Sequence, residues 1–323
     1  MKNVTSKRST TLAQLTLTFG MLYVAQTSSG RFVIIDGGMK TAAHKATLLD
    51  YLATKSEGKK PVIACWMFTH LDGDHVDNAF DILLNHSEEL EVQCLGCGFP
   101  VREDFAPVEG DHPQHNLWRK SAAGVQEYAV ARWEKIKALY PNAEIWDMRC
   151  DDRREIDDVK LHVLISAFER LPMFPISHNS RSAVIKMTFT QGTEDESDDV
   201  TFMATGDSGG DERCEFMLKR YPASYLHSDI LQVIHHGMYG GHTEFYQAVD
   251  PKICFWPTTE ARFFGYEMDR DGNAVSYANL TQDLPCNAYL RDDSVRVRTH
   301  YHGEQSIEID TRDLSVTILH QPQ

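Results

Sequence analysis

Short apolar runs, separated by glycine, proline or charged residues, recur along the whole chain. Alternating or continuous apolar positions predict strands, in chain order over 12–18, 22–26, 32–35, 61–68, 90–95, 159–165, 182–190, 200–205, 230–234, 253–255, 294–299, 306–309 and 314–319. Apolar positions at helical spacing predict helices, over 41–55, 76–84, 118–140, 212–220 and 243–249. Strands therefore dominate each half of the chain, with helices between them.

This order of elements predicts an α/β (α+β) fold in which two packed sheets are covered by helices on the outside, a four-layer αββα sandwich. No internal repeat or flexible linker divides the 323 residues, so we expect a single domain over 1–323. We expect insertions near 98–145 and 257–293. The helix over 118–140 is predicted to bury the face formed by Val125, Tyr128, Ala129, Trp133, Ile136 and Leu139.

Composition narrows the class of protein. Hydrophobic residues make up 42% and charged residues 24% of the chain, which is typical of a soluble globular protein. No apolar stretch is long enough to span a bilayer, and the N-terminus lacks a signal-peptide core, so we expect no membrane association. Seven scattered cysteines, an odd number, fit a reducing compartment. We therefore expect a cytoplasmic protein.

The net charge of −15 restricts the partners. It opposes sustained binding to a polyphosphate backbone, which disfavours nucleic acid as a partner without excluding it. A small-molecule or phosphoester substrate suits this charge better. The sequence identifies no protein partner.

Four side chains that can bind metals follow the strand predicted over 61–68, namely His70, Asp72, Asp74 and His75. His70 and Asp72 project to the same side of an extended chain, whereas the adjacent Asp74 and His75 diverge, so the loop can serve two cations. Imidazole with carboxylate suits Zn, Mn or Fe, and the thiolates of closed structural zinc sites are missing. The pattern indicates a catalytic metal site. Alternatively, these residues only begin a helix, with Asp74 as its N-cap.

Two later strands also end in ligand-type residues. Asp207 follows the strand over 200–205, and His235 and His236 end the strand over 230–234. Strand ends at one edge of a layered fold converge on a common crevice, so these residues are expected to meet the first group. We expect His235 to be the metal ligand, because it comes first off the strand, and His236 either to support a ligand or to face the substrate.

A further candidate ligand is His178, just before the strand over 182–190, and Asn179 is the alternative at that position. In order, these residues resemble the motifs of the metallo-β-lactamase fold superfamily: the strand-end Asp36, the loop from His70 to His75, His178 with Ser182, Asp207, and His235 or His236. Asp72 stands where that family has a second histidine. The resulting HxDxDH variant is similar to the metallo-hydrolase domains of ComEC-type competence proteins.

The resemblance implies a metallo-β-lactamase-like sandwich with a binuclear metal centre. One divalent ion would be held by His70, Asp72 and His178, and the other by Asp74, His75 and His235 or His236, with Asp207 bridging the two. Zn is the first choice, with Mn or Fe as alternatives. Asp36 and Thr69 would orient a histidine. Asp74 and His236 are the expected catalytic residues, and His236 would protonate the leaving group if it is not a ligand.

The implied activity is metal-dependent hydrolysis by a metal-activated water, with phosphoesters or phosphodiesters as the favoured substrates. A carboxylic ester or lactone hydrolase is the enzymatic alternative. A third hypothesis is a non-catalytic protein that uses the fold as a binding or assembly surface. Asp72 and the aromatic-rich tract over 255–266 favour this third hypothesis.

Overall fold

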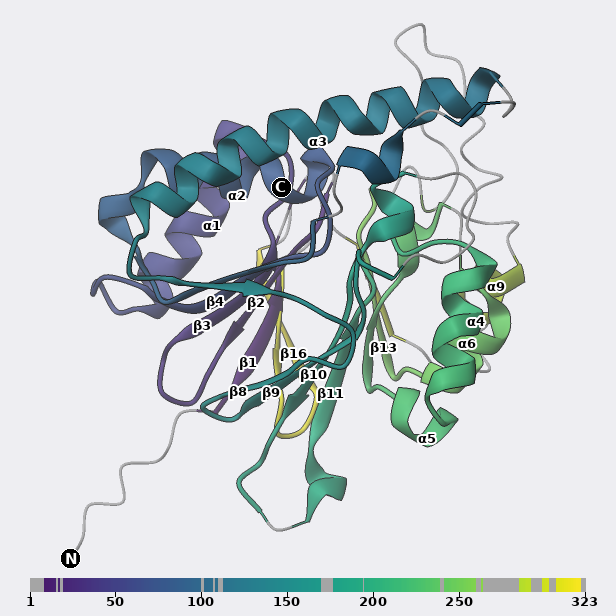
Figure 1. Ribbon diagram of the computed structural model, residues 1–323. Coiled ribbons are helices and arrows are strands. Elements are labelled where there is room, and N and C mark those ends of the chain that lie inside the picture. The colour runs from purple at the N-terminus through teal and green to yellow at the C-terminus, as the bar shows by residue number, and fades with distance from the viewer. Residues whose placement is uncertain are drawn as a thin grey trace, which may run out of the picture.

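Two β-sheets packed face to face form the centre of the molecule, and helices cover the outer face of each (Figure 1). This computed structural model describes residues 9–15, 17, 20–99, 102–106, 108–109, 113–169, 177–193, 195–238, 241–259, 263, 285–291, 298–301 and 306–320. The predicted four-layer αββα sandwich is confirmed. Within the described ranges, no helix is both long enough and apolar enough to cross a membrane.

The first sheet contains nine strands within the described residues. They are β1 (Thr11–Gln14), β2 (Leu22–Gln26), β3 (Phe32–Asp36), β4 (Val62–Phe68), β5 (Glu91–Val92), β6 (Cys94–Cys97), β7 (Glu144–Asp147), β15 (Ser306–Asp310) and β16 (Ser315–His320). Their order is β16-β15-β1-β2-β3-β4-β6-β7, with β5 also paired to β4. The pairs β3–β4 and β4–β6 are parallel, whereas β1–β2 and β2–β3 are antiparallel.

The second sheet contains seven strands in the described part of the chain. They are β8 (Arg153–Ile156), β9 (Val159–Ile165), β10 (Val184–Phe189), β11 (Val200–Ala204), β12 (Ile230–Gln232), β13 (Ile253–Trp256) and β14 (Arg298–Tyr301). Their order is β14-β13-β12-β11-β10-β9-β8. The strands β11 to β14 are parallel, so β11, β12 and β13 end at the same edge of this sheet.

Helices form the two outer layers. They are α1 (Ala42–Lys55), α2 (Gly73–Asn85), α3 (Pro113–Leu139), α4 (Asp211–Arg220), α5 (Ala223–Leu226), α6 (Thr243–Val249) and α9 (Pro285–Arg291). The 3-10 turns are η1 (Ser87–Glu89), η2 (Arg102–Phe105), η3 (Asn179–Arg181), η4 (Glu196–Asp198) and η5 (Ile234–Gly237). Helices α1 to α3 cover the first sheet, and α4, α6 and α9 cover the second (Figure 1).

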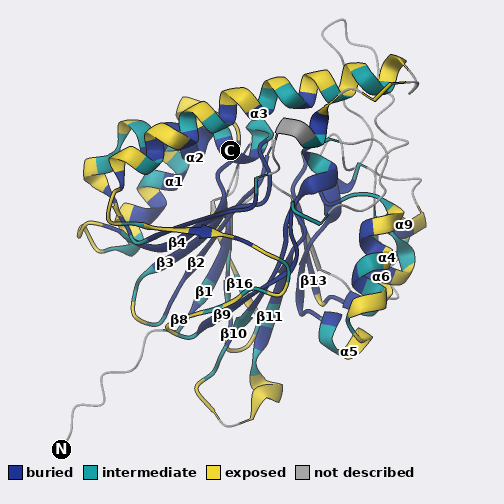
Figure 2. Ribbon diagram, in the orientation of Figure 1, coloured by how far each residue is buried: buried dark blue, intermediate teal, exposed yellow. Residues whose placement is uncertain are grey.

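Both faces of the central strands are buried, because each face packs against another layer (Figure 2). In β2, Val24 belongs to the core under α1 to α3, and the adjacent Tyr23 belongs to the core between the sheets. The Tyr23 ring lies 5.3 Å from the Phe202 ring and 5.5 Å from the Phe255 ring, both on the second sheet. The period-two alternation of a strand thus divides its side chains between two apolar cores.

The face of α3 that packs on the first sheet differs from the predicted one. Its buried stripe consists of Ala122, Gln126, Ala129, Trp133 and Ile136. Tyr128 and Leu139 were predicted to be buried but are 62% and 47% exposed. Consecutive helical residues point about 100° apart, so Tyr128 turns away from the sheet although it is next to the buried Ala129.

Helix α2 begins earlier than predicted. Asp72, not Asp74, is its N-cap residue, and the Asp72 side chain makes no capping hydrogen bond. Asp74 and His75 therefore lie in the first helical turn. The short elements β7, β8, α5 and α9 were not predicted. The proposed insertion over 98–145 contains η2 and α3, whereas most of 257–293 lies outside the described residues.

Candidate metal centre

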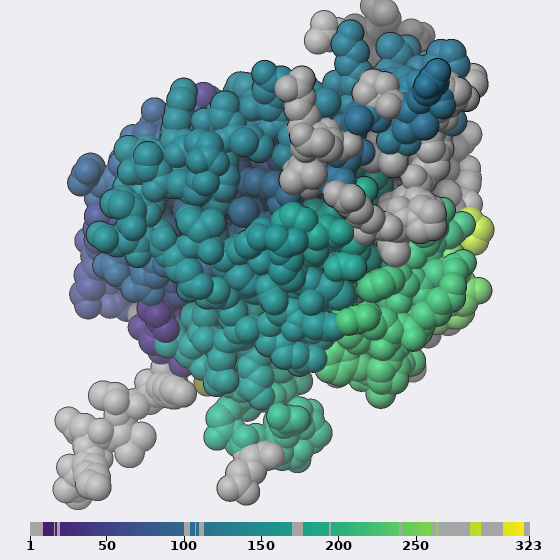
Figure 3. All heavy atoms as spheres, in the orientation of Figure 1, coloured from purple at the N-terminus to yellow at the C-terminus, as the bar shows by residue number. Residues whose placement is uncertain are grey.

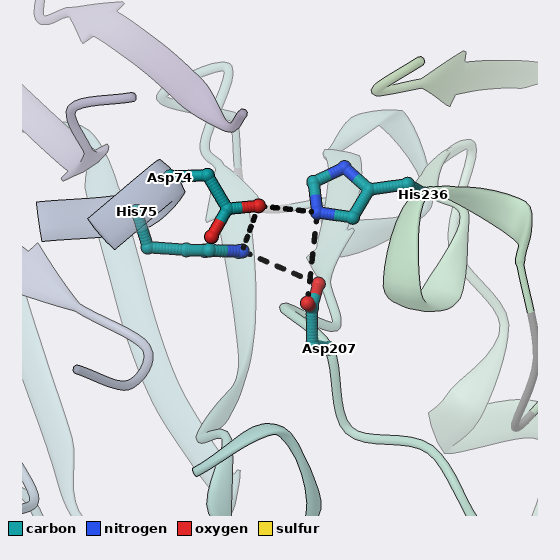
Figure 4. A group of neighbouring side chains, drawn as sticks. All are labelled: Asp74, His75, Asp207 and His236. Atoms are coloured by element: carbon teal, nitrogen blue, oxygen red, sulfur yellow. Dashed lines mark ion pairs between the residues drawn. The ribbon is translucent and has the colours of Figure 1, made fainter. Parts of the chain in front are cut away.

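Asp74, His75, Asp207 and His236, which all follow the C-terminal ends of strands, meet with their polar atoms facing one another (Figure 4). One ligand-type atom of each lies within 4.8 Å of those of the other three. Asp74 Oδ2 is 3.0 Å from His236 Nε2 and 4.0 Å from His75 Nε2. Asp207 lies 3.3 Å from His75 Nε2 and 3.6 Å from His236 Nε2. These four residues are called the carboxylate–imidazole cluster below.

The first turn of α2 brings Asp74 and His75 to the cluster, and close backbone packing holds it there. The Met21 and Gly37 amides donate hydrogen bonds to the carbonyls of Asp74 and His75 at 3.1 and 2.7 Å. A Cβ atom on Gly20 would lie 2.4 Å from the Asp74 carbonyl oxygen, and one on Gly37 would lie 2.5 Å from the Ala79 Cβ. These glycines therefore allow the chain around β2 and β3 to approach α2.

His235 and His236 lie in η5, directly after β12, and both have left-handed backbone conformations with φ of 49° and 56°. The Trp256 indole donates to the His236 carbonyl at 3.0 Å, and His236 Nδ1 lies 2.6 Å from the Pro257 carbonyl oxygen. The Pro257 carbonyl therefore accepts the Nδ1 proton, and Nε2 is directed at Asp74 and Asp207.

The sequence favoured His235 as the ligand beside Asp74 and His75, but His236 is the residue that lies there. His235 Nε2 is 3.5 Å from Asp207 Oδ2, and it is also 3.0 Å from the Asn179 side-chain amide. Two consecutive left-handed residues turn the imidazoles in directions that strand order does not reveal. Whether either residue binds a metal stays a prediction.

Asp36 anchors this part of the centre from the end of β3. It is fully buried, with one carboxylate oxygen 2.8 Å from His75 Nδ1. The Thr69 amide and hydroxyl donate to the same carboxylate at 2.8 and 2.7 Å. Asp36 and Thr69 therefore both contact His75, and their role in orienting a metal ligand stays a prediction. A carboxylate that accepts Nδ1–H leaves Nε2 for a metal.

His70 and Asp72 lie beside the cluster. His70 Nε2 is 3.8 Å from both Asp72 Oδ2 and Asp207 Oδ2, and its Nδ1 is 2.9 Å from the Ser182 hydroxyl. Asp207 Oδ2 therefore has His70, His235 and His236 around it, which is the central position expected of a bridging carboxylate.

His178 lies outside the carboxylate–imidazole cluster, although its charge would lower the pKa of His70. Its Nε2 lies 2.8 Å from the Ala122 carbonyl on α3, and its ring lies 4.7 Å from the Phe105 ring. The neighbouring Asn179 is the residue that reaches His235. The sequence offered both as candidates, and no sequence signal separated them, because the loop before η3 decides which side chain points inward.

The centre concentrates negative charge. Asp36, Asp72, Asp74 and Asp207 have no lysine or arginine within ion-pair distance among the described residues. Burial raises the pKa of Asp72 to about 7, and the charges of Asp74 and Asp207 add to this shift. Burial also opposes ionisation of Asp207, but the nearby histidines, His236 foremost, outweigh it and hold the pKa of Asp207 well below its usual range.

The same carboxylates change the pKa values of the nearby histidines. Burial alone would lower the pKa of His75 and His236, but Asp207 and its neighbours outweigh burial and raise the pKa of His75 well above its usual value and that of His236 to about 9. Burial lowers the pKa of His70, and His75 lowers it further. A metal binds an imidazole only in its neutral form, so metal binding to His75 or His236 would have to displace a proton held by these carboxylates.

The residues present fit a divalent metal ion. Nε2 of His70, Nε2 of His75 and Oδ1 of Asp207 are buried without a hydrogen-bond partner in the described structure. Such buried polar atoms are rare in proteins unless an ion or water satisfies them. The imidazole and carboxylate donors suit Zn, Mn or Fe, as the sequence predicted.

No family model matches the chain, and no curated protein matches it. Three similar solved structures are the metallo-β-lactamase fold protein YhfI from Bacillus subtilis (9% identity, TM-score 0.47, 96% of this chain and 100% of that one), the diiron β-hydroxylase CmlA from Streptomyces venezuelae (10%, 0.48, 95% and 54%) and a long form RNase Z from yeast (11%, 0.45, 89% and 44%). This chain spans about half the length of the last two. Likenesses at this level carry no information on activity, cofactor or substrate.

Proposed function

We propose that this protein is a metal-dependent hydrolase of the metallo-β-lactamase superfamily that binds two divalent cations and cleaves phosphoesters or phosphodiesters. The carboxylate–imidazole cluster carries the proposal, because it unites ligand-type atoms from α2, the turn after β11 and η5 within 4.8 Å. These residues are distant in sequence, and Nδ1 of both His75 and His236 is held by a hydrogen bond to Asp36 or Pro257. This arrangement is typical of metal sites rather than of ordinary polar cores.

The residues divide into two groups around Asp207. Asp74, His75 and His236 would hold one cation with Asp207, and His70 and Asp72 would contribute to holding the other. Divalent cations bound there would supply Lewis acidity and a nucleophile at neutral pH. Asp36 holds the His75 ring, the Pro257 carbonyl holds the His236 ring, and the Ser182 hydroxyl holds the His70 ring.

The side of the centre open to substrate is marked by two carboxylates. The Asp72 and Asp74 side chains are 31% and 20% exposed, whereas Asp207 is 3% exposed. A substrate would therefore approach past Asp72 and Asp74. The phosphoester preference follows from the resemblance of the HxDxDH loop to ComEC-type domains.

Metal analysis and a hydrolysis assay test the proposal together. Purified protein is expected to contain Zn, Mn or Fe and to cleave bis-p-nitrophenyl phosphate. Asp207→Ala should lose both metal and activity, whereas Asp195→Ala, which removes an exposed carboxylate in the loop before η4, should keep both. Full turnover by Asp207→Ala would disprove the proposal.

A substrate panel separates the alternatives. Preferential cleavage of p-nitrophenyl acetate or a γ-lactone would assign the centre to carboxylic esters instead of phosphoesters. Metal-free wild-type protein that cleaves none of these substrates would favour the binding or assembly hypothesis.

A further inference from the structure

Arg213 on α4 lies behind the candidate metal centre and is fully buried. Its Nε donates to the Ser208 hydroxyl at 2.5 Å, and its Nη2 donates to the Ser182 carbonyl. Ser208 directly follows Asp207, and Ser182 lies between η3 and β10. A single guanidinium therefore joins the turn that carries Asp207 to a second loop.

The second loop reaches the centre through the Ser182 side chain. Its hydroxyl accepts a hydrogen bond from the Asp207 amide at 3.0 Å and lies 2.9 Å from His70 Nδ1. For His70 Nε2 to bind a metal, Nδ1 must keep its proton and donate it. The Ser182 hydroxyl at 2.9 Å is the nearer acceptor, and the Thr69 hydroxyl lies at 3.2 Å. Movement of Ser182 would thus displace both His70 and Asp207.

The surroundings of Arg213 do not favour a charged residue. No carboxylate lies within ion-pair distance of it in the described ranges, and its Nη1 is buried without a hydrogen-bond partner there. Burial, with the nearby Arg181 cation, lowers the pKa of Arg213 to about 9. The other inward-facing residues of α4, Cys214 and Met217, are apolar. An unpaired buried charge lowers the free energy of unfolding, so a gain in stability does not explain why Arg213 is buried against Ser182 and Ser208.

We propose that Arg213 is a positioning residue of the metal centre, whose planar guanidinium fixes Ser182 and the Asp207–Ser208 turn relative to each other so that His70 and Asp207 face the same cation. This inference rests on the proposed function. Lysine cannot reproduce the arrangement, because a single ammonium lacks the fork of donors that reaches two fixed acceptors.

The test measures metal affinity by chelator competition in the full chain, together with kcat, KM and the melting temperature. Arg213→Met and Arg213→Lys are both expected to weaken cation binding by about 10- to 100-fold, the usual effect of losing a partner that orients a metal ligand. Ser208→Ala, which removes the hydroxyl that accepts from Arg213 Nε, should weaken cation binding in the same direction with Arg213 intact, so the inference stays testable if an Arg213 variant folds poorly. Turnover measured at saturating metal should recover in part.

Arg181→Met is the matched control. Arg181 is also buried and lies near Arg213, but it donates to the Ala167 and Glu169 carbonyls. The Arg181→Met variant should keep the wild-type affinity for metal. The inference fails if Arg213→Met binds metal as tightly as the wild type, or if Arg181→Met loses as much affinity. Wild-type protein that binds no metal would instead remove the proposed function, and this inference with it.

Discussion

At the scale of single residues, the centre depends on an unfavourable backbone conformation. His235 and His236 are consecutive non-glycine residues with positive φ. Each such residue costs on the order of 1 to 3 kcal/mol and persists only when its surroundings enforce it. The enforcing contacts are the bonds from Trp256 to the His236 carbonyl and from Asn287 to the Gly237 carbonyl. If the proposed function is correct, this conformation is what directs the His236 imidazole at Asp74 and Asp207.

The two histidines are expected to differ in their effect on metal content. His236→Ala removes a member of the carboxylate–imidazole cluster, so one cation per chain should be lost. His235→Ala and His178→Ala should each keep the cation at the cluster, because neither imidazole belongs to it. Metal content by elemental mass spectrometry after dialysis measures the difference. Equal retention by His236→Ala and His178→Ala would contradict this assignment.

Asp36→Asn tests how His75 is oriented. Asparagine tolerates the left-handed conformation of this position, where φ is 57°, so the backbone should be preserved. The amide is neutral and accepts Nδ1–H less strongly than a carboxylate, so metal affinity should fall by about 10- to 100-fold. Chelator competition measures the change. An unaltered affinity would mean that the Asp36 charge does not support His75.

At this scale, the sequence predicted which strand ends lie near one another, but not which side chain a turn or loop directs inward, as His235, His236 and His178 show. His70, Asp72, Asp74 and His75 follow β4 directly. His70 and His75 lie 3.8 and 3.3 Å from Asp207, Asp74 belongs to the carboxylate–imidazole cluster, and Asp72 lies 3.8 Å from His70. The loop before η3 instead directs His178 to α3, because its Nε2 meets the Ala122 carbonyl. Loop geometry depends on contacts that have no period in the sequence.

At the scale of elements, the position of α2 is set by backbone packing against β3. A Cβ at position 37 would collide with Ala79 at 2.5 Å. Because α2 carries Asp74 and His75 in its first turn, any shift of this helix moves two ligand-type side chains together.

Gly37→Ala is expected to destabilise the protein by about 1 to 3 kcal/mol, the usual effect of forcing extra atoms into a packed interior. It should also weaken metal binding. Gly124→Ala is the control, because a Cβ there meets no atom within 4 Å and lies in α3. Alanine in a helix interior should stabilise by about 1 kcal/mol. Urea unfolding measures both, and a Gly37→Ala variant as stable as the wild type would show that α2 adjusts freely.

Hydrophobic pattern predicted long or strongly apolar elements well and short ones poorly. The helix predicted over 243–249 coincides with α6, and the strand over 159–165 coincides with β9. The strand β8 was missed because three of its four residues, Arg153 to Glu155, are charged, and none of the four is fully buried at this edge of the sheet. Such an edge strand forms because β9 offers unpaired backbone groups, which a sequence pattern does not display.

At the scale of the whole molecule, the first and second halves of the chain form different parts of the surface. Figure 3 shows the purple N-terminal residues and the green residues after β11 on opposite sides. The centre joins these halves in the interior, since Asp74 and His75 come from one and Asp207 and His236 from the other. A bound cation would therefore contribute to global stability.

Removal of metal should lower the free energy of unfolding. A ligand that binds only the folded state stabilises it by about 2.7 kcal/mol at 100 times its dissociation constant. Urea titration with and without EDTA measures the difference, and readdition of Zn or Mn should restore it. Asp207→Ala should show no response to either. An equal EDTA effect on this variant would place the responsible metal elsewhere in the protein.

The carboxylate–imidazole cluster takes two residues from α2 and two from the segments after β11 and β12. Neither half of the polypeptide carries a complete coordination set, so fragments separated by cleavage within the loop over 191–199 would leave Asp74 and His75 on one piece and Asp207 and His236 on the other. Tight metal uptake would return only when the pieces dock correctly. The amount of metal that the mixed fragments bind would therefore report how much of the protein has regained the native fold.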